Sequence, residues 1–317
     1  MKAEIKIATY NIDGLPDYLD LNDLPWILKP ISWIYKLIKK TTIIKINDDS
    51  DTPEKIKKIG KVLLDSDSDI IGVQEDFNYH SELMESLSEN YNCGTYSGGF
   101  DLKNLFKSTE WKTMFPLPRF KADGINIINK KSRINVIKEE IISWNDGYGY
   151  FNHANDLLTH KGFRYYSLII DGEYKLDVYV LHMDADFYNE TTCPDVSGDI
   201  EARKLELKQL TNFILDKADN GANTPSIIIG DTNSSNDYYW DVNNINYNLL
   251  YPINASAHLS IKEAVPDNYM NVDRIFYINN SHSNYDVQLI ECYFDLDIER
   301  LSDHKPLYAK FEITKKS

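Results

Sequence analysis

Short apolar segments recur along the whole chain, and their length is typical of buried β-strands. The clearest are residues 69–74 (Asp-Ile-Ile-Gly-Val-Gln), 176–181 and 226–229. Similar strand-like segments are 5–10, 125–128, 163–170, 272–278 and 307–311. A nearly continuous apolar run is expected where a strand is covered on both faces. Any fold for this chain must therefore provide covering layers on both sides of its strands.

Between these segments, apolar residues recur at helical spacing. Thr52-Pro53-Glu54 is typical of a helix start, because proline fits the first helical turn. Helical spacing follows over 56–63, 83–87 and 205–214. No internal repeat, low-complexity stretch or linker interrupts the alternation. The sequence therefore predicts an α/β fold with a single domain over 1–317.

Two aromatic-rich stretches, at about 16–51 and 100–120, do not fit the regular alternation, and we interpret them as insertions. Within the first, residues 26–38 are amphipathic and of helical character, are interrupted by Pro30 and end among lysines. Such a segment usually covers a core. Aromatic residues beside lysines also suit a helix lying in a membrane interface, so peripheral membrane contact through 26–38 is a hypothesis.

The charge balance limits the classes of partner. There are 34 Lys and Arg residues and 49 Asp and Glu residues, and 34 − 49 gives a net charge of −15. This charge opposes tight non-specific binding to DNA, and weakly opposes binding to anionic membranes, but does not oppose a zwitterionic lipid. Nucleic acid is therefore the less favoured partner, and the oligomeric state is left open.

Outside the strand ends, the spacing of the cysteines and histidines indicates no further metal site, disulfide framework or catalytic motif. The three cysteines Cys93, Cys193 and Cys292 are far apart, which makes a zinc site or a disulfide framework improbable. Four histidines lie in no recognisable motif, and we expect surface or structural roles for them: His80, His153, His258 and His282.

No signal peptide or transmembrane span is recognisable in the sequence. Both a cytoplasmic protein and a secreted protein whose signal has been removed agree with this pattern.

Polar residues with catalytic potential follow the predicted strands. Asn11, Glu75, His182 and Asp231 each come at or directly after a strand end, and Asn233 follows within two residues. Asp273, Asp303 and His304 stand at or near the beginnings of the last predicted strands. Because ligands bind where strand ends and their loops converge, we expect these side chains to meet.

The residue types suit hydrolysis of a phosphate ester. Oxygen ligands such as Glu75 and Asn11 suit Mg²⁺ (or Mn²⁺), which neutralises phosphoryl charge. Asp231 could position or deprotonate the attacking water, and Asn233 could donate to a phosphoryl oxygen. A histidine such as His304 could protonate a leaving group, with a paired aspartate fixing its tautomer.

Six pieces of the sequence resemble, in order, the motifs of the endonuclease/exonuclease/phosphatase superfamily. They are Thr9-Tyr10-Asn11, Gln74-Glu75, Leu181-His182, Gly230-Asp231-Thr232-Asn233, Val272-Asp273-Arg274 and Ser302-Asp303-His304-Lys305-Pro306. Each alone is weak, but together they span almost the whole chain. The resemblance implies the four-layer α/β/β/α sandwich of the deoxyribonuclease-I-like type.

The resemblance also implies roles for individual residues. Glu75 would be the principal metal ligand, with Asn11 beside it and Asp303 near the metal. Asp231 and Asn233 would handle the water and the phosphate. His304 would be held by Asp273, and His182 would complete the phosphate-binding set.

Further pieces divide between two subfamilies. Asp123-Gly124-Ile125, Lys131-Ser132-Arg133 and the loop from Asp156 to Lys161-Gly162-Phe163 resemble sphingomyelinases. Asn11 to Leu15, Gly230 to Asn233 and Asp273 to Phe276 are similar to tyrosyl-DNA phosphodiesterases. Met183-Asp184-Ala185 stands where sphingomyelinases commonly have a glutamine.

The leading hypothesis is an enzyme, a Mg²⁺-dependent phosphodiesterase resembling neutral sphingomyelinase, with Lys161 and Asp156 as substrate-binding residues. An exposed loop lysine is the alternative interpretation of Lys161. Other functions are a nucleic-acid phosphodiesterase of endonuclease or tyrosyl-DNA type, a phosphatase of soluble or inositol phosphates, and a binding module that has lost the chemistry.

Overall fold

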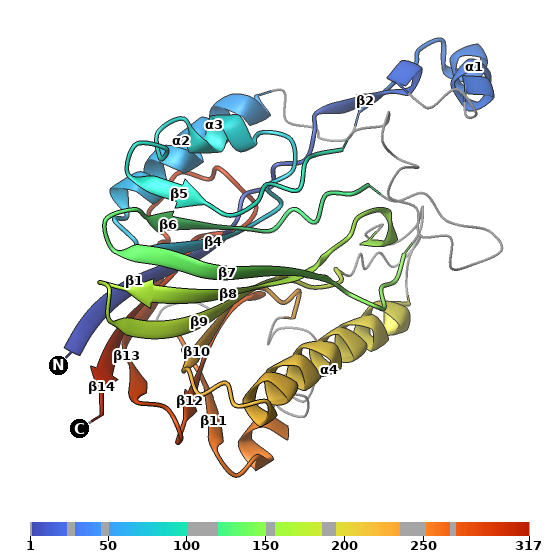
Figure 1. The fold of residues 1–317 in the computed structure, drawn as a ribbon. Helices are drawn as coiled ribbons and strands as arrows, with labels where there is room; N and C mark the ends of the chain where they lie inside the picture. Colours follow the sequence, from blue (N-terminus) through green and yellow to red (C-terminus); the bar gives the residue numbers. More distant parts are fainter. Residues whose placement is uncertain are drawn as a thin grey trace.

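Two six-stranded mixed sheets form the body of the molecule in the computed structural model (Figure 1). The structure describes residues 2–23, 29–45, 51–100, 120–149, 156–185, 195–234, 252–266 and 271–316. The first sheet has the order β13 (Tyr285–Phe294), β14 (Leu307–Lys315), β1 (Lys2–Asn11), β4 (Ile70–Gln74), β6 (Asn126–Lys130), β5 (Tyr91–Cys93). The second has the order β11 (Leu259–Glu263), β12 (Asp273–Asn280), β10 (Ser226–Asp231), β9 (Tyr174–His182), β8 (Gly162–Ile170), β7 (Ile134–Ser143).

The two sheets pack face to face around a shared apolar core. Alternate residues of each central strand point into it, as the two-residue period of a strand requires. Ile5 and Ile7 of β1 meet Val178 and Val180 of β9 and Ile227 of β10 in this layer. The strands are apolar on both faces because the residues between these also face a covered layer.

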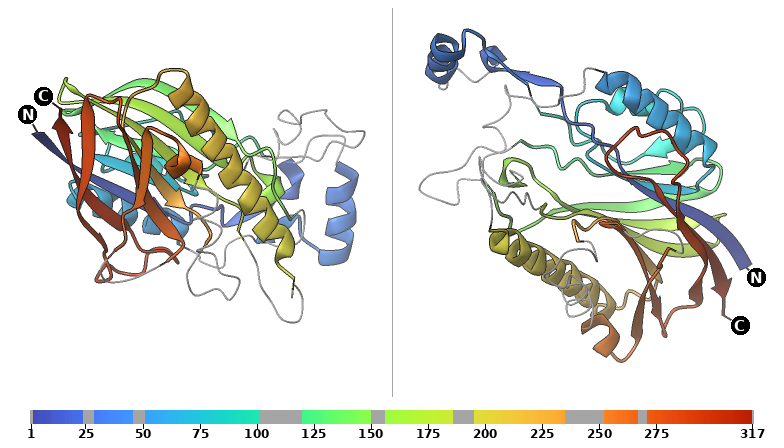
Figure 2. Two further views of the ribbon diagram at one scale, coloured as in Figure 1. Left: turned by 90° about the horizontal axis from the view of Figure 1, so that it is seen from below. Right: turned by 180° about the vertical axis from the view of Figure 1, so that it is seen from behind.

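Helices cover the outer faces of the two sheets. Ile56, Ile59 and Leu63 of α2 (Thr52–Asp65), with Leu83 of the short α3 (His80–Met84), pack on the outer side of the first sheet. Leu207, Leu210 and Ile214 of α4 (Ser197–Asp219) pack on the second. Figure 2 shows α2 and α4 on opposite sides of the sheets. The predicted four-layer deoxyribonuclease-I-like fold class is confirmed.

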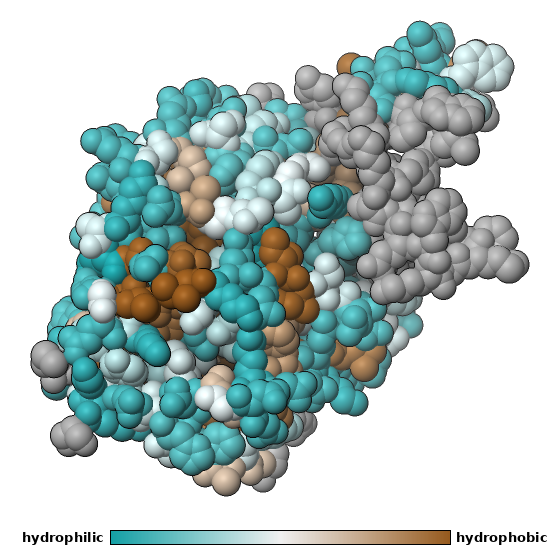
Figure 3. All heavy atoms as spheres, viewed as in Figure 1, coloured by the Kyte–Doolittle hydropathy of each residue, from teal (hydrophilic) through white to brown (hydrophobic). Residues whose placement is uncertain are grey.

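The sequence predicted the interior strands and missed the edges. All eight interior strands of the two sheets overlap a predicted segment, whereas β5, β7, β11 and β13 were not predicted. Edge strands carry charged residues and expose much of one face. In β7, Lys138 and Glu139 interrupt an apolar pattern, and Val136, Ile137 and Ile141 face solvent. Apolar patches are visible on this face of the molecule (Figure 3).

The first predicted insertion contains a small arm beyond the sandwich. It consists of β2 (Tyr18–Asp20), β3 (Ile43–Lys45), a single 3-10 turn η1 (Leu21–Asp23) and helix α1 (Lys29–Lys39). Figures 1 and 2 show α1 standing off the sheets at the edge where β1 ends. Pro30 lies in the first turn of α1, where its missing N–H falls at a position that needs no donor. Residues 24–28, and with them Trp26, lie outside the described residues.

Most of the second predicted insertion, residues 101–119, also lies outside the described part. At its borders, Phe100 and Phe120 pack with ring centroids 4.4 Å apart, and Phe100 meets Phe77 edge to face at 4.9 Å. The two ends of this segment therefore lie close together, beside the loop that follows β4 and begins with Glu75. Among the described helices, none combines the length and the apolar character that crossing a membrane requires.

Candidate active site

Strand pairing brings the predicted site residues to one edge of the sandwich. In the first sheet, Asn11 at the end of β1 lies opposite Gln74, the residue before Glu75. In the second, Asp231 at the end of β10 lies opposite both His182 and Asp273. Parallel neighbours end at the same edge, and an antiparallel neighbour begins there. The strand order therefore fixes which side chains can meet.

The backbone turns sharply directly after two of these strands. Glu75 and Asn233 adopt φ values of 59° and 49°, in the left-handed region that most residues avoid. Gly14 allows the Glu75 turn, because a Cβ on Gly14 would lie 2.4 Å from the Glu75 carbonyl oxygen. Such strain at two predicted site residues is typical of positions held for function.

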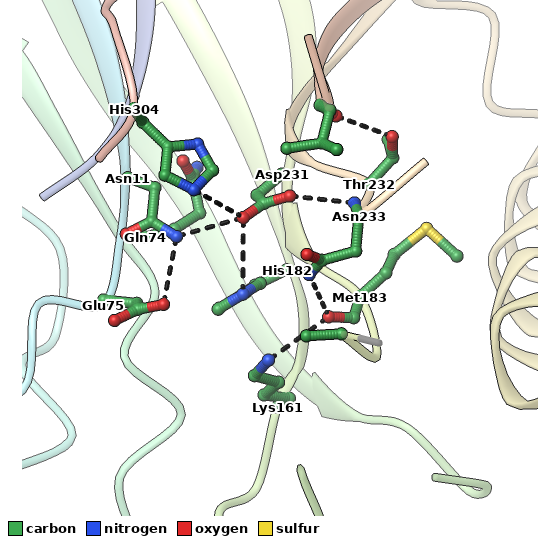
Figure 4. A network of polar contacts seen from close by, with 12 residues as sticks. Asn11, Gln74, Glu75, Lys161, His182, Met183, Asp231, Thr232, Asn233 and His304 are labelled. Carbon is green, nitrogen blue, oxygen red and sulfur yellow. Dashed lines mark hydrogen bonds and ion pairs between the residues drawn. The ribbon is translucent and has the colours of Figure 1, made fainter. Parts of the chain in front are cut away.

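Asn11 joins the two sheets at the centre of the site (Figure 4). Its Nδ2 donates to Glu75 Oε1 at 3.1 Å and to Asp231 Oδ2 at 3.0 Å. Burial raises the pKa of Glu75 to about 7, against the charge of Lys161 and the Asn11 hydrogen bond. The Asn11 amide thus holds the carboxylates of Glu75 and Asp231 close together, so that one bound cation could contact both.

Asp231 lies between two histidines. Its Oδ2 is 3.6 Å from Nε2 of His182 and 3.6 Å from Nε2 of His304, while Oδ1 accepts the Asn233 N–H at 2.8 Å. Burial opposes the charge of Asp231, but the charge of His304 and the hydrogen bonds from Asn11 and Asn233 outweigh it and lower the pKa. Asp231 is therefore an ionised carboxylate although it is almost fully buried.

The two histidines differ in charge. His304 Nδ1 lies 2.7 Å from Asp273 Oδ2, and although burial opposes protonation, Asp273 and Asp231 hold the pKa of His304 well above its ordinary value. Burial raises the pKa of Asp273 to about 6, which leaves it ionised at neutral pH. Burial and the charge of Lys161 hold the pKa of His182 well below its ordinary value. The site thus combines a cationic and a neutral imidazole.

Lys161 lies within the site, and the alternative of an exposed loop lysine is wrong. Its side chain is only 13% exposed and forms an ion pair with Asp156, which begins the 3-10 turn η4 (Asp156–Leu158). Its Nζ donates to the Met183 carbonyl at 3.3 Å, and Asn233 Nδ2 donates to the same oxygen at 2.9 Å. Lys161 is therefore linked to Asn233 through one carbonyl group.

Asp303 is placed differently from the other predicted residues. Its side chain is 68% exposed, and its Oδ1 is 3.9 Å from His304 Nε2. The described contacts do not join it to Glu75 or Asn11. Its neighbour Ser302 holds the loop instead, donating to the Asn11 carbonyl at 2.8 Å and accepting the His304 N–H at 3.1 Å.

Two supporting contacts were not anticipated from the sequence. Trp144 Nε1 donates to the His182 carbonyl at 2.8 Å, and Glu206 of α4 accepts the Asp184 N–H at 2.9 Å. Trp144 follows a missed edge strand and Glu206 lies in the middle of a helix, so neither position carries a local signal. The first contact holds the backbone of His182 itself, and the second holds the backbone two residues further along the chain.

Two groups of side chains could hold a cation. One consists of Glu75, Asn11 and Asp231, which already converge. In the other, Asp231, Asp273 and His304 offer ligand atoms that all lie within 4.8 Å of one another. Asp273 engages Nδ1 of His304, so only Nε2 of that ring remains to bind a metal. The first group, with its two carboxylates, is the better match for Mg²⁺, which prefers oxygen ligands.

No family model and no curated protein sequence matches this chain. Solved structures do. A beta toxin from Staphylococcus aureus has a TM-score of 0.60 at 14% identity, covering 96% of this chain and 99% of that one. Sphingomyelinase C from Streptomyces griseocarneus has 0.58 at 15%, covering 97% and 99%. A humanized D. rerio TDP2 has 0.55 at 13%, covering 97% and 98%. These likenesses establish the deoxyribonuclease-I-like fold over nearly the whole chain.

The charge difference between the two histidines can be measured by NMR titration of the ring nitrogens in the metal-free protein. We expect His304 to stay protonated well above the ordinary histidine pKa of about 6.5, and His182 to stay neutral well below it. Asp273→Asn removes the largest favourable charge and should lower the pKa of His304. The raised pKa of His304 contributes stability that is fully present below the ordinary histidine pKa and is lost as the pH rises through the pKa of His304 in the folded protein. An unchanged His304 titration in Asp273→Asn would show that the contact does not set the charge.

Proposed function

We propose that this protein is a divalent-metal-dependent phosphodiesterase that cleaves the head-group phosphodiester of a membrane lipid, as a sphingomyelinase does. The observation that carries the proposal is the meeting of two groups of side chains at Asp231. Glu75 and Asn11 come from one sheet, and His304, Asp273 and His182 surround Asp231 from the other side. The named neighbours support the reaction class of phosphodiester cleavage, since one is a sphingomyelinase C and another is TDP2 in complex with a single-strand DNA product.

The donor set of Glu75, Asn11 and Asp231 fits a hard divalent cation. The Asn11 Nδ2 lies 3.1 Å or less from one oxygen of each carboxylate, while its Oδ1 accepts the Asp13 N–H at 3.1 Å. The two carboxylates would supply the charged oxygen ligands, and Asn11 would add its Oδ1 only by turning over and releasing the Asp13 N–H. A magnesium-containing structure of Staphylococcus aureus beta toxin shares the fold, with a TM-score of 0.57 at 14% identity over 99% of this chain. When bound, the cation would neutralise phosphoryl charge.

The protein groups divide the remaining work between water and phosphate. Hydrolysis of a phosphodiester adds water to phosphorus and releases an alcohol. The ionised Asp231 can accept the proton of the attacking water, because its Oδ2 faces the interior of the site. His304 can donate its Nε2 proton to a phosphoryl oxygen or to the leaving oxygen, while Asp273 holds the opposite nitrogen.

His182, Asn233 and Lys161 complete the surroundings of the phosphate. His182 is neutral, so its Nε2 can bind a phosphoryl oxygen without adding a charge that repels His304. Asn233 Nδ2 uses one N–H for the Met183 carbonyl, which leaves its second N–H as a donor. Lys161 brings a positive charge that attracts the anionic substrate into an otherwise acidic molecule.

A lipid is favoured over nucleic acid by charge and by the arm at the site edge. The net charge of −15 disfavours a polyanion but not a zwitterionic head group. In α1, Trp33 and Leu37 are 64% and 61% exposed and stand four residues apart on one face. Exposed lysines of the same helix, such as Lys36, suit an orientation in the plane of a membrane surface.

Metal dependence and substrate class can be tested together. Mg²⁺-dependent cleavage is measured on sphingomyelin vesicles, plasmid DNA and a phosphotyrosyl oligonucleotide. Chelation should abolish activity, and Mg²⁺ should restore it better than Ca²⁺, which prefers more ligands. Glu75→Gln should lower activity by on the order of a hundredfold or more, because the cation loses a charged ligand.

Each result of this panel is decisive. Cleavage that survives excess chelator would refute the metal mechanism. Efficient cleavage of either DNA substrate with none of sphingomyelin would replace the lipid with nucleic acid. Glu75→Ala gives the background rate for all three substrates.

The role of the arm can be tested with Trp33→Ala and Leu37→Ala together. If α1 binds the membrane, this variant should hydrolyse sphingomyelin in vesicles more slowly by on the order of tenfold or more, because the interfacial burial of two apolar side chains is lost. Hydrolysis of a small soluble choline phosphodiester should be nearly unchanged, since the site residues are untouched.

Ile137→Ala is the matched control, because it removes an apolar side chain that is 56% exposed on β7. It should leave both rates unchanged. Equal losses on vesicles and on the soluble ester in the α1 variant would mean that the arm supports the fold and does not bind the membrane.

A further inference from the structure

A second group of interacting side chains lies on the first sheet, away from the cluster around Asp231. Cys93 ends the edge strand β5, His80 begins α3, and Asp76 follows Glu75 after β4. His80 Nδ1 lies 2.6 Å from Asp76 Oδ2, and its Nε2 lies 3.6 Å from Cys93 Sγ. Thiol, imidazole and carboxylate thus stand in a row, with the imidazole bonded through both of its nitrogens.

The Asp76 carboxylate favours a charged imidazole. Its side chain is 1% exposed, and a buried carboxylate is costly without a countercharge. The Asn126 amide adds a long hydrogen bond of 3.4 Å, and Asp76 Oδ1 has no hydrogen-bond partner in the described part of the chain. Among the described contacts of Asp76, the His80 imidazole is therefore the group that supplies the compensating positive charge.

A stacking contact also holds the ring of His80 in place. Tyr96 stacks on it with a centroid distance of 4.4 Å and an interplanar angle of 12°. Burial opposes protonation, but the contacts with Asp76 and Cys93 prevail and raise the pKa of His80 to about 10. At neutral pH the ring is an imidazolium that directs its Nε2–H at the sulfur.

Cys93 is the accessible member of the row. It is exposed, whereas Cys292 is buried and donates its S–H to the Ala264 carbonyl at 3.3 Å. A thiolate is the reactive form of cysteine, and an adjacent imidazolium stabilises it. A carboxylate behind the imidazole is the arrangement that activates nucleophilic thiols. Exposure, the facing cation and the buried carboxylate together distinguish Cys93 from Cys292.

We propose that Cys93 is a reactive thiol, activated by the His80–Asp76 pair, that exchanges with small disulfides of the glutathione type. The Cys93 thiolate attacks one sulfur of the disulfide and forms a new S–S bond as the old one breaks. The other half leaves as a thiolate with the bonding electron pair and takes a proton from solvent. Cys93 is oxidised, half of the disulfide is reduced, and no further reagent is needed. The inference does not depend on the proposed phosphodiesterase activity.

The test uses the full-length protein with Cys193→Ser, which removes the cysteine outside the described residues. The release of thiopyridone from 4,4′-dithiodipyridine is followed at about pH 6, well below the ordinary thiol pKa of about 8.5. One fast thiol is expected, which Cys93→Ser removes and Cys292→Ser retains. His80→Gln keeps a polar side chain without the charge, and should slow the fast reaction by on the order of tenfold or more. Mass spectrometry after treatment with glutathione disulfide should place the mixed disulfide on Cys93.

A second measurement needs no substitution at His80. The rate for Cys93 in the folded protein is compared with its rate in the chain unfolded by guanidinium, where the three side chains separate. A faster rate in the folded protein supports activation. An equal or slower rate in the folded protein, or an unchanged rate in a folded His80→Gln variant, would overturn the proposal.

Discussion

The hydrogen bond from Asn11 to Asp231 is the interaction on which the candidate site depends, because it joins the edges of two different sheets. Asn11 ends β1 of one sheet and Asp231 ends β10 of the other, with 3.0 Å between donor and acceptor. Asp231 is 1% exposed, so its charge must be compensated inside the protein. That requirement draws His182 and His304 to one oxygen and Asn233 to the other. The packing of the sheets on their shared apolar core therefore brings together the two edges whose side chains form the site.

Much of this arrangement could be predicted, and the missing parts share physical causes. Interior strands such as β4 and β10 are apolar on both faces, so their sequence pattern predicts them. The edge strand β7 carries charged residues that interrupt its apolar pattern, so it was not predicted. The strand-end rule found the residues that meet at Asp231, but it could not orient Asp303, whose side chain points largely to solvent. The strand-end rule could not predict contacts between residues that are distant in sequence and lie in no motif. His80 and Cys93 are 13 residues apart in no known motif, and only the return of the chain from α3 to β5 brings them together.

The distribution of charge connects the site with the rest of the molecule. The chain as a whole is strongly acidic, yet the interior of the site holds the cations of Lys161 and His304. Each of these cations is paired with a carboxylate, Asp156 or Asp273, so attraction of a phosphate to the site would also need a bound metal cation. A long polyanion would in addition meet repulsion elsewhere on the surface. The arm with α1 lies at the same edge as the end of β1 and leaves Trp33 and Leu37 exposed. Both features fit a small anionic group presented on a neutral interface.

The most direct test of this account is the position of Mn²⁺ in crystals of the protein, located by anomalous scattering. We expect one peak in contact with the Glu75 carboxylate and next to Asn11, at the edge where the two sheets meet, and its loss in Glu75→Gln crystals. Mn²⁺ is suited to the same oxygen ligands as Mg²⁺ and scatters strongly enough to be placed without ambiguity. A peak that is absent from this edge, or one that persists unchanged in Glu75→Gln, would contradict the assignment of a metal-dependent site to these residues.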